Sequence, residues 1–437
     1  MHHLHRRISI RRLLAGVALA AASFASNADA ADPAVFLVSE APLAARLASI
    51  DGEWNISFRA GDKLRVVPAK DLSYWGRYRD VESGPQILLQ DGSLIRADVL
   101  QLDARSLILG DATGLGRGLW DERPLPRSAV RAVLYQPPAA AAERDKLVAQ
   151  LAADRGTEDR LLLAGGESVS GVLVAVPPDG RFLRENARPG QGLFQWSRPG
   201  QAGTLSIPAT KVVAIELGSP SAPRPTDASQ SVWLGLRDGS LVNAAAIRAQ
   251  NDKVKINLAA GGELTTSLAG PGDPHATFWD EVTFLQPSGP RVVWLSDLKT
   301  LGYKHIPFLS IDWPYENDRS VTGSRLRSSG AVFPKGLGMH TTSRLAYDVA
   351  GFRTFEAEIA LDESAGRRGS VIFKVLLQDS AGAWNPAYES PVIRGGEAPT
   401  PISVELKGAA RLALIVEFAD RGDELDHANW LQARLLK

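Results

Sequence analysis

Short apolar or alternating runs fill residues 35–287, and Asp-Gly or Gly-Gly pairs separate them. Alternation with a period of two places one face of a strand in a core. An Asp-Gly pair between two such runs is a strong local signal of a β-hairpin. The clearest example surrounds Asp91-Gly92, and the same phrase returns around Asp238-Gly239. The pattern therefore predicts a region built from β-hairpins.

A proline pattern recurs through the same region. Pro68, Pro126 and Pro208 are each followed by apolar residues four and seven positions later. Proline fixes its own φ and donates no ladder hydrogen bond, so it fits a short turn before a strand. A fourth copy lacks the proline but keeps Val282 and Leu285. We therefore predict four degenerate β-rich repeats, near residues 35–78, 84–136, 160–218 and 231–287.

Each repeat has room for four or five short strands, which favours an array of small, strongly bent β-barrels of the Sm-like kind. The spacing of the repeats is uneven and the first one is short. Two alternatives therefore stay open: neighbouring units that share a sheet, or a single irregular β-sandwich.

The segments between the repeats have different compositions. We expect two repeat units in 31–138, a third in 160–218 and a fourth in 231–290. Residues 139–159 are good helix formers with little apolar face, so they predict an exposed helical spacer. Residues 219–230 are rich in proline and serine, which is typical of an extended linker.

The amino terminus has the three parts of a secretory signal. Arginines 6, 7, 11 and 12 precede an apolar run at 13–25, and Ala28-Asp29-Ala30 closes the segment. This pattern predicts a signal peptide, residues 1–30, cleaved after Ala30. An uncleaved anchor is the alternative, and the paired arginines point only weakly to twin-arginine export. No other stretch is long and apolar enough to span a bilayer. We therefore expect an exported protein, periplasmic or extracellular, without a membrane span after cleavage.

Composition narrows the function classes. The chain has 437 residues with 49 basic and 49 acidic side chains. Without the first 30 residues, 45 basic side chains face 48 acidic ones. A weakly acidic body argues against nucleic acid as a partner, because phosphate binding needs a basic surface. The absence of cysteine from the sequence excludes disulfides, thiolate metal sites and a cysteine nucleophile.

From Trp294 onward the predicted strands lengthen and aromatic residues become denser. Three motifs follow the opening Trp294–Leu298 in a fixed order: Lys335-Gly336-Leu337-Gly338-Met339-His340, then Gly369-Ser370-Val371-Ile372-Phe373-Lys374-Val375, then Asp426-His427-Ala428-Asn429-Trp430. Over about residues 292–437 the sequence resembles the NPCBM family, the carbohydrate-binding module also attached to glycoside hydrolase family 98 enzymes. We place this domain at 291–437.

The resemblance implies a galactose-binding-like β-sandwich of jelly-roll type, with a glycan, galactose-type sugars among them, held by its end loops. A buried calcium ion often accompanies such modules. Asp423, Glu424 and Asp426 supply oxygens of the right type, although no ligand set follows from the sequence. One departure is the segment Gln378–Gly382, which stands where the family often has an Asp-Gly-type turn.

Sugar recognition needs an aromatic surface and polar groups that fix hydroxyl positions. The candidates for carbohydrate binding are Trp313, Tyr315, His340, Trp384 and Tyr388. Each aromatic candidate has a packing role as its alternative, and the alternative for His340 is a histidine that satisfies buried backbone groups. The residues expected to have structural roles are Lys335, Gly336, Gly338, Asp426, His427 and Trp430. Among these, we expect Trp430 in the core, while Asp426 and His427 fix the last strand or a nearby ion.

The sequence favours recognition over catalysis. It contains neither a His-Glu-x-x-His metal motif nor a Gly-x-Ser-x-Gly nucleophile elbow. A pair of catalytic carboxylates stays open, since their separation is a tertiary property. We therefore predict an exported, non-catalytic carbohydrate-binding protein. The alternatives are a structural protein that binds protein partners at the repeat edges and, less favoured, a glycoside hydrolase.

Overall fold

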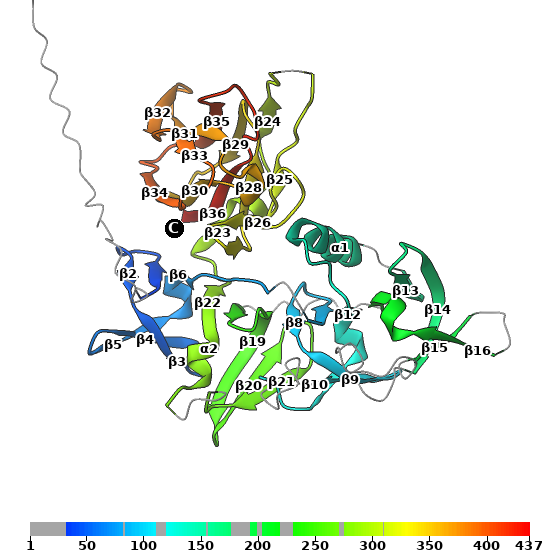
Figure 1. The fold of residues 1–437 in the computed structure, drawn as a ribbon. Coiled ribbons are helices and arrows are strands. Elements are labelled where there is room, and N and C mark those ends of the chain that lie inside the picture. Colours follow the sequence, from blue (N-terminus) through cyan, green and yellow to red (C-terminus); the bar gives the residue numbers. More distant parts are fainter. Residues whose placement is uncertain are drawn as a thin grey trace, which may run out of the picture. The chain divides into compact units, whose positions relative to one another are not determined.

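The computed structural model describes residues 32–81, 84–110, 119–153, 156–175, 193–198, 203–218, 230–270, 275–308 and 310–437. The predicted signal peptide and all but residue 230 of the predicted linker lie outside these residues. Within them, no helix has the length and apolar character needed to cross a membrane. The prediction of an all-β protein is confirmed, because strands make up most of the described chain (Figure 1).

The first two repeat ranges each contain strands that lead to a short 3-10 helix and then a closing strand. In the first range the elements are β1 (Ala34–Leu37), β2 (Leu43–Ala44), β3 (Arg46–Ile50), β4 (Asn55–Ala60), β5 (Lys63–Pro68), η1 (Ala69–Asp71) and β6 (Leu72–Gly76). In the second they are β7 (Gln86–Leu89), β8 (Leu94–Arg96), β9 (Asp98–Leu102), β10 (Ser106–Gly110), β11 (Pro124–Pro126), η2 (Arg127–Ala129) and β12 (Val130–Leu134).

The third and fourth ranges repeat this order after helix α1 (Ala141–Ala153). In the third range the elements are β13 (Asp159–Leu163), β14 (Ser168–Ala175), β15 (Leu193–Ser197), β16 (Thr204–Pro208), η4 (Ala209–Lys211) and β17 (Val212–Glu216). In the fourth they are β18 (Val232–Leu236), β19 (Leu241–Gln250), β20 (Lys253–Leu258), β21 (Glu263–Ser267), α2 (Phe278–Glu281) and β22 (Val282–Pro287).

The recurring prolines have one structural position. Pro68, Pro126 and Pro208 each lie directly before a 3-10 helix with φ between −60° and −57°, within the range that the proline ring allows. The apolar residue four positions later begins the closing strand. In the fourth copy a capping box replaces the proline: Thr277 and Asp280 satisfy each other's backbone N–H groups at the start of α2.

The four units are joined through shared strands, which is one of the arrangements that the sequence left open. In each unit the closing strand pairs with the first strand, and closing strands also pair between units, as β12–β17 and β6–β22. At the centre, β8 pairs with β19 through Leu94 and Leu241. The order along the sheet is therefore third, second, fourth and first unit.

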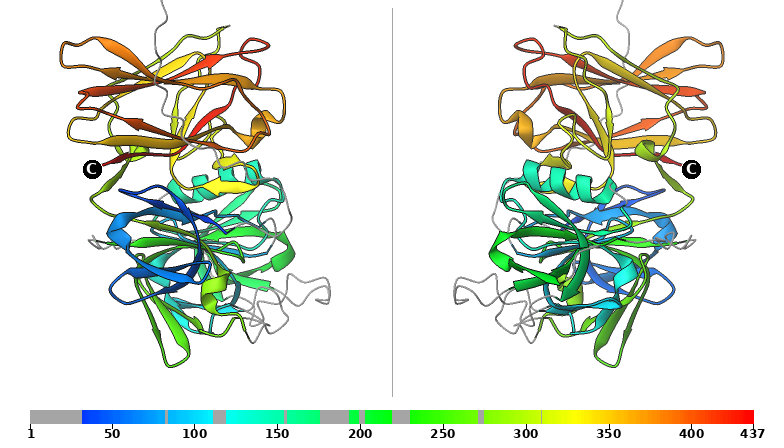
Figure 2. Two further views of the ribbon diagram at one scale, coloured as in Figure 1. Left: turned by 90° about the vertical axis from the view of Figure 1, so that its left-hand side faces the viewer. Right: turned by 90° about the vertical axis from the view of Figure 1, so that its right-hand side faces the viewer.

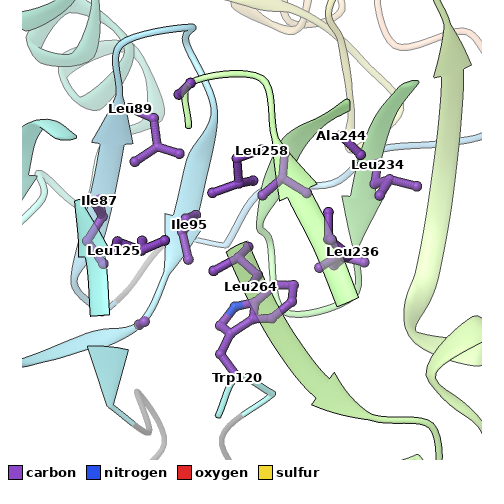
Figure 3. Packing of buried hydrophobic residues seen from close by; sticks show 14 of the residues in the cluster. Ile87, Leu89, Ile95, Trp120, Leu125, Leu234, Leu236, Ala244, Leu258 and Leu264 are labelled. Carbon is purple, nitrogen blue, oxygen red and sulfur yellow. The ribbon is translucent and has the colours of Figure 1, made fainter. Parts of the chain in front are cut away.

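The unit cores contain large aliphatic and aromatic side chains. Figure 3 shows Ile87, Ile95 and Leu125 of the second unit close to the core of the fourth, which includes Leu234 and Leu236. These five side chains are all buried, and they belong to one contiguous hydrophobic cluster. The joined sheet is therefore accompanied by a joined core.

The predicted spacer does form a helix, α1, but the expectation that this helix is exposed is wrong. Leu151 is fully buried and belongs to a cluster with residues of β7, β8, β12 and β17. Asp145, also on α1, is buried, and its carboxylate accepts hydrogen bonds from Arg325 Nε at 2.7 Å and Arg327 Nη2 at 3.0 Å. The weak apolar face of the helix suggested exposure. The helix is instead held in place largely by buried ion pairs, which an apolar face does not reveal.

The C-terminal region is a β-sandwich, as the resemblance implied; in Figure 2 its strands, coloured yellow to red, form two layers. One sheet has the order β25-β28-β36-β30-β34, with β23 also paired to β36. Its strands are β23 (Val292–Trp294), β25 (Glu316–Asn317), β28 (Gly336–Met339), β30 (Thr354–Leu361), β34 (Thr400–Glu405) and β36 (Ala428–Leu436).

The facing sheet has the order β24-β29-β35-β31-β32, with β33 also paired to β31. Its strands are β24 (Gly302–His305), β29 (Ser343–Asp348), β31 (Ser370–Gln378), β32 (Trp384–Glu389), β33 (Ile393–Arg394) and β35 (Arg411–Phe418). Outside both sheets lie η5 (Leu295–Asp297), β26 (Leu326–Ser328), β27 (Ala331–Phe333) and η6 (Glu363–Ala365). Between the sheets Trp430 is fully buried, with its ring 4.9 Å from that of Phe373.

The glycines of the first motif lie where backbone segments approach closely. A Cβ on Gly336, whose φ is +149°, would lie 2.5 Å from the carbonyl oxygen of Trp430. A Cβ on Gly338 would lie 2.4 Å from the carbonyl oxygen of Arg319. These glycines let β28 fit between β25 and β36. The neighbouring Lys335 fixes the entry to the strand through its ion pairs with Asp297 and Asp318.

Candidate functional site

A cluster of three histidines and one tryptophan lies at the end of the sandwich where β24 and β28 finish. His305 is the last residue of β24, and His340 directly follows β28. Both rings point at one acceptor: His305 Nε2 and His340 Nδ1 each lie 3.0 Å from the carbonyl oxygen of Thr341. A carbonyl oxygen only accepts, so both ring nitrogens carry a hydrogen.

Trp313 covers this pair. Its backbone N–H donates to His305 Nδ1 at 3.2 Å, so His305 is a neutral ring with the hydrogen on Nε2. The indole stacks on His340 with ring centroids 4.6 Å apart and planes 5° apart. Trp313 is half-buried, whereas the side chain of His305 is only 4% exposed. The tryptophan therefore forms the accessible part of the cluster.

His427 is the third ring, 6.0 Å from His340 and 5.9 Å from Trp313. Its Nδ1 lies 2.9 Å from Ser364 Oγ, and that hydroxyl donates to Asp362 Oδ1 at 2.7 Å. Since the hydroxyl hydrogen is used on Asp362, Ser364 Oγ accepts from His427 Nδ1–H. The hydrogen-bond chain thus fixes this tautomer also, and it leaves Nε2 of His427 as an acceptor.

The environment keeps two of these rings uncharged. Burial lowers the pKa of His340, and the nearby His305 acts in the same direction, against the Thr341 carbonyl and the charge of Asp423. Burial also lowers the pKa of His427, with His340 as a second cause. Both rings are therefore neutral at neutral pH. With Nδ1 protonated in each, the Nε2 atoms of His340 and His427 are hydrogen-bond acceptors beside a half-buried indole.

Asp426 holds together the chain segments that carry the cluster. It is fully buried, and its two carboxylate oxygens accept from Thr341 Oγ1 at 2.8 Å and from the backbone N–H of Ser370 at 2.9 Å. Burial raises its pKa to about 6 in spite of these bonds, and the charge of Asp423 adds to the shift. Asp426 joins β28 and β31 to the start of β36, as expected of a residue that fixes the last strand.

The loop between β24 and β25 also carries exposed apolar side chains. Ile306, Phe308 and Ile311 are 55%, 63% and 62% exposed, and the ring of Phe308 lies 6.4 Å from that of Phe418. The carboxylate of Asp312 lies on the same loop, 3.6 Å from His305 Nδ1. The cluster therefore has an apolar rim as well as polar acceptors.

The structure brings together only part of the candidate set. Trp313 and His340 are in direct contact, whereas Tyr315 packs against Tyr303 at the margin of the core, with the two ring planes tilted by 52°. Trp384 and Tyr388 lie on β32, at the opposite edge of the sheet from His305. Burial raises the pKa of Tyr388, which packs against the core.

His305 was not among the site residues predicted from the sequence. The residue occurs 35 positions before His340 and in no motif, so only a prediction of strand ends could have brought the two together. Thr341 was also not predicted as a site residue. It takes part through its backbone carbonyl, and the pattern of side chains along the sequence does not reveal such a role.

The implied calcium ion does not fit the acidic residues considered for it. Both oxygens of Asp426 are already occupied by protein donors, and Glu424 forms an ion pair with Arg368. In the part of the chain that the structure describes, no three His, Asp or Glu side chains are arranged to hold a metal ion.

Comparison with known proteins places the sandwich in a family. Residues 291–436 match the NPCBM/NEW2 domain, which confirms the resemblance seen in the sequence. A Renibacterium salmoninarum protein, provisionally named endo-alpha-N-acetylgalactosaminidase, is 28% identical over 195 residues. That match covers 42% of this chain and only 13% of the relative.

Two solved structures from Clostridium perfringens are similar at lower identity. A CBM51 module of a GH95 protein, in complex with methyl-galactose, is 22% identical and covers 33% of this chain and 99% of that one, with a TM-score of 0.29. The CBM51-2 and INT domains of ZmpB, in complex with GlcNAc, are 22% identical, cover 42% of this chain and 36% of that one, and have a TM-score of 0.30. Similarity at this level assigns no ligand to this chain.

Proposed function

Because residues 291–436 form an NPCBM/NEW2 domain, we propose that the protein is an exported, non-catalytic glycan-binding protein. The domain binds a neutral sugar at the cluster of Trp313, His340 and His427. One observation carries this proposal: two neutral imidazoles, with Nδ1 of each committed inside the protein, leave their Nε2 acceptors beside a half-buried indole.

The chemistry matches a sugar that offers hydroxyl donors and an apolar ring face. A hydroxyl group donates to Nε2 of His340 or His427, and the C–H surface of the ring packs against the indole edge of Trp313 and the exposed loop side chains. Because the pKa values of His340 and His427 are lowered, both rings are neutral at neutral pH. Their Nε2 atoms therefore act as hydrogen-bond acceptors there. A site of this shallow kind gives weak affinity for one sugar unit.

Isothermal titration calorimetry of the mature chain with methyl galactoside and with N-acetylglucosamine tests the proposal, and a glycan array extends it to other sugars. We expect weak binding that Trp313→Ala abolishes and His340→Ala reduces at least about tenfold, since each removes a direct contact. Trp384→Ala, at the other edge of the sheet, is the matched control and leaves this binding unchanged. A folded protein that binds no glycan on the array contradicts the proposal.

Export is proposed on the amino-terminal pattern alone. The basic start, the apolar run and the small residues at 28–30 are the parts that a signal peptidase requires. Fractionation of expressing cells, followed by mass spectrometry of the amino terminus, tests it. We expect a mature chain that begins at Ala31 outside the cytoplasm, and an intact amino terminus in the soluble cytoplasmic fraction refutes it.

A role in protein interaction is the second candidate, and one feature of the first repeat favours it. Strand β5 is at the edge of the three-stranded sheet β3-β4-β5, and it exposes Leu64 at 58% and Val66 at 56%. An exposed apolar edge strand is a surface to which a further strand can add. Light scattering of the mature chain and of Val66→Lys compares self-association, which this substitution should abolish if the edge pairs with a second copy.

A further inference from the structure

The outer face of the second sandwich sheet contains a groove lined by side chains other than those of the histidine cluster. The groove crosses β24, β29, β35, β31 and β32 and has a volume of about 650 Å³. Five strands at about 4.8 Å spacing span roughly 19 Å, which is longer than one sugar ring. One row of paired residues across the strands contains Trp384, Gln378 and Arg411. On β35 this row is five residues from the row that contains His305.

The residue pattern of the strands explains why this face is hollow. On β29 and β35 the core side takes Leu345, Leu412 and Leu414, while the outer side takes alanines at positions 346 and 413. Small side chains at the centre leave the floor low. Large apolar side chains form the rim, with Leu301 51% and Trp384 40% exposed.

Three cations surround this apolar floor: Lys304, Arg344 and Arg411, all exposed. Among the described residues none of the three side chains has an acidic group within ion-pair distance. Lys374, in the same cross-strand row as Arg344, is paired instead: its Nζ lies 2.8 Å from Glu417 and 3.4 Å from Glu389. The groove therefore keeps positive charge that the protein does not neutralise.

One acid lies beside Arg411. Asp348 is opposite Arg411 in the strand register, but its Oδ1 accepts the backbone N–H of Ala350 at 3.0 Å, and the two side chains form no ion pair. When Lys374 and its partners Glu389 and Glu417 are counted with these groups, four cations stand against three carboxylates, which leaves an excess of one positive charge. This excess stands out in a mature chain that carries more acidic than basic residues.

We propose that this groove is a second binding site and that its ligand is an acidic oligosaccharide, a chain of sugars that bears carboxylate or sulfate groups. The exposed indole of Trp384 stacks against a sugar ring, while Arg344 and Arg411 bind the anionic groups, the guanidinium fork being suited to a carboxylate or a sulfate. Lys304 adds a third charge at the other side. Charge complementarity selects this ligand over a neutral glycan.

The site does not depend on the function proposed for the histidine cluster, because it shares no side chain with it. The two can therefore fail separately. Trp313→Ala removes the contact at the cluster and leaves the groove intact, whereas Trp384→Ala does the reverse.

Calorimetry of the mature chain with three hexasaccharides tests the groove: oligogalacturonate for carboxylates, a chondroitin sulfate fragment for sulfates and carboxylates, and maltohexaose as the neutral comparison. We expect binding of one or both acidic probes, no binding of the neutral one, and an affinity that falls as NaCl rises from about 0.05 to about 0.5 M. Binding of the chondroitin sulfate fragment alone identifies sulfate as the preferred group.

The variants assign the binding to the groove. Arg344→Ala and Arg411→Ala should each weaken it about tenfold, and Trp384→Ala about as much, because each removes one direct contact. Arg248→Ala, an exposed arginine on β19, and Trp313→Ala should leave it unchanged. Circular dichroism establishes that each variant is folded.

Four results overturn the proposal. The first is the failure of both acidic probes to bind, and the second is equal binding of maltohexaose. The third is binding of an acidic probe that Arg344→Ala and Arg411→Ala do not weaken. A thymidine hexanucleotide that binds as well as the acidic sugars, and is lost with the same substitutions, also rejects a glycan as the ligand.

Discussion

The buried carboxyl of Asp426 should make the stability of the sandwich fall as pH rises through the weakly acidic range. Burial, with a contribution from the charge of Asp423, raises its pKa from 3.8 to about 6, although Ser370 N–H and Thr341 Oγ1 donate to the carboxylate. Between about pH 4 and pH 6 the folded domain therefore holds a proton that the unfolded chain has lost.

The sign and the size follow from this difference. A group whose pKa is higher in the folded state contributes stability that is fully present below the unfolded pKa and is lost as pH rises through the folded pKa. A shift of about two pH units at about 1.4 kcal/mol per unit corresponds to about 3 kcal/mol. The histidines oppose this trend: His340 and His427 have lowered pKa values, so their contribution grows as pH rises.

A comparison of the protein with its Asp426→Asn variant isolates the carboxyl, because the histidines titrate in both. Hydrogen exchange of β36, measured by mass spectrometry on the full chain, reports the free energy of opening this domain. We expect the stability advantage of the unsubstituted protein over this variant to be about 2–3 kcal/mol larger at about pH 4 than at about pH 7.5. Glu405→Gln, at an exposed carboxyl, should show no such rise. A flat difference, or an advantage that grows with pH, refutes the reasoning.

Three further substitutions test the packing. Gly338→Ala should destabilise the domain by about 1–3 kcal/mol in thermal unfolding, because its Cβ would overlap a backbone carbonyl, whereas Gly302→Ala, with open space around it, should be neutral. Asp145→Ala should cost about 3–5 kcal/mol in urea unfolding, since it leaves two arginines short of a buried partner, and an unchanged midpoint contradicts this. Ser93→Ala should cost about 1–3 kcal/mol by removing the acceptor for the N–H of Asn243, and full protection of that amide in hydrogen exchange argues against it.

Local features of the fold were predictable from the sequence. The turns at Asp91-Gly92 and Asp238-Gly239 are found where the hairpin signal placed them, and the recurring prolines precede short helices. Both signals depend only on neighbouring residues, since φ at proline and positive φ at glycine are properties of one position. Gly92 and Gly239 have φ values of +90° and +89°.

Pairing between units was not predictable to the same degree. Which closing strand meets which depends on contacts between residues far apart in the chain, and β12–β17 looks locally the same as any other antiparallel pair. The burial of α1 was missed for a related reason. The weak apolar face of α1 does not indicate the partners of Asp145. These are Arg325 and Arg327, about 180 residues away in the chain.

The candidate site shows the same division. His340 was identified by its motif, and Trp313 as an aromatic residue in a loop-like sequence. The other two members of the cluster, His305 and His427, come from separate segments of the chain. His427 was expected to act structurally, and its Nδ1 does so through Ser364, while the other nitrogen of the same ring stays available. Under the proposed function one side chain has both roles, and a sequence argument that chooses between them misses one.

The centre of the repeat array shows how a local turn also determines a long-range contact. In the hairpins around residues 91–94 and 238–241, each Asp accepts the N–H of the Ser two positions later. Each serine hydroxyl then accepts a backbone N–H of the other hairpin, Ser93 from Asn243 and Ser240 from Arg96, both at 2.9 Å. The two contacts are reciprocal, as a two-fold relation between the hairpins requires. The order of the four units agrees with the same two-fold relation, which swaps the second and fourth units and also the third and first. The repeated Asp-Gly-Ser motif therefore forms the turn of each hairpin and also connects the second unit to the fourth.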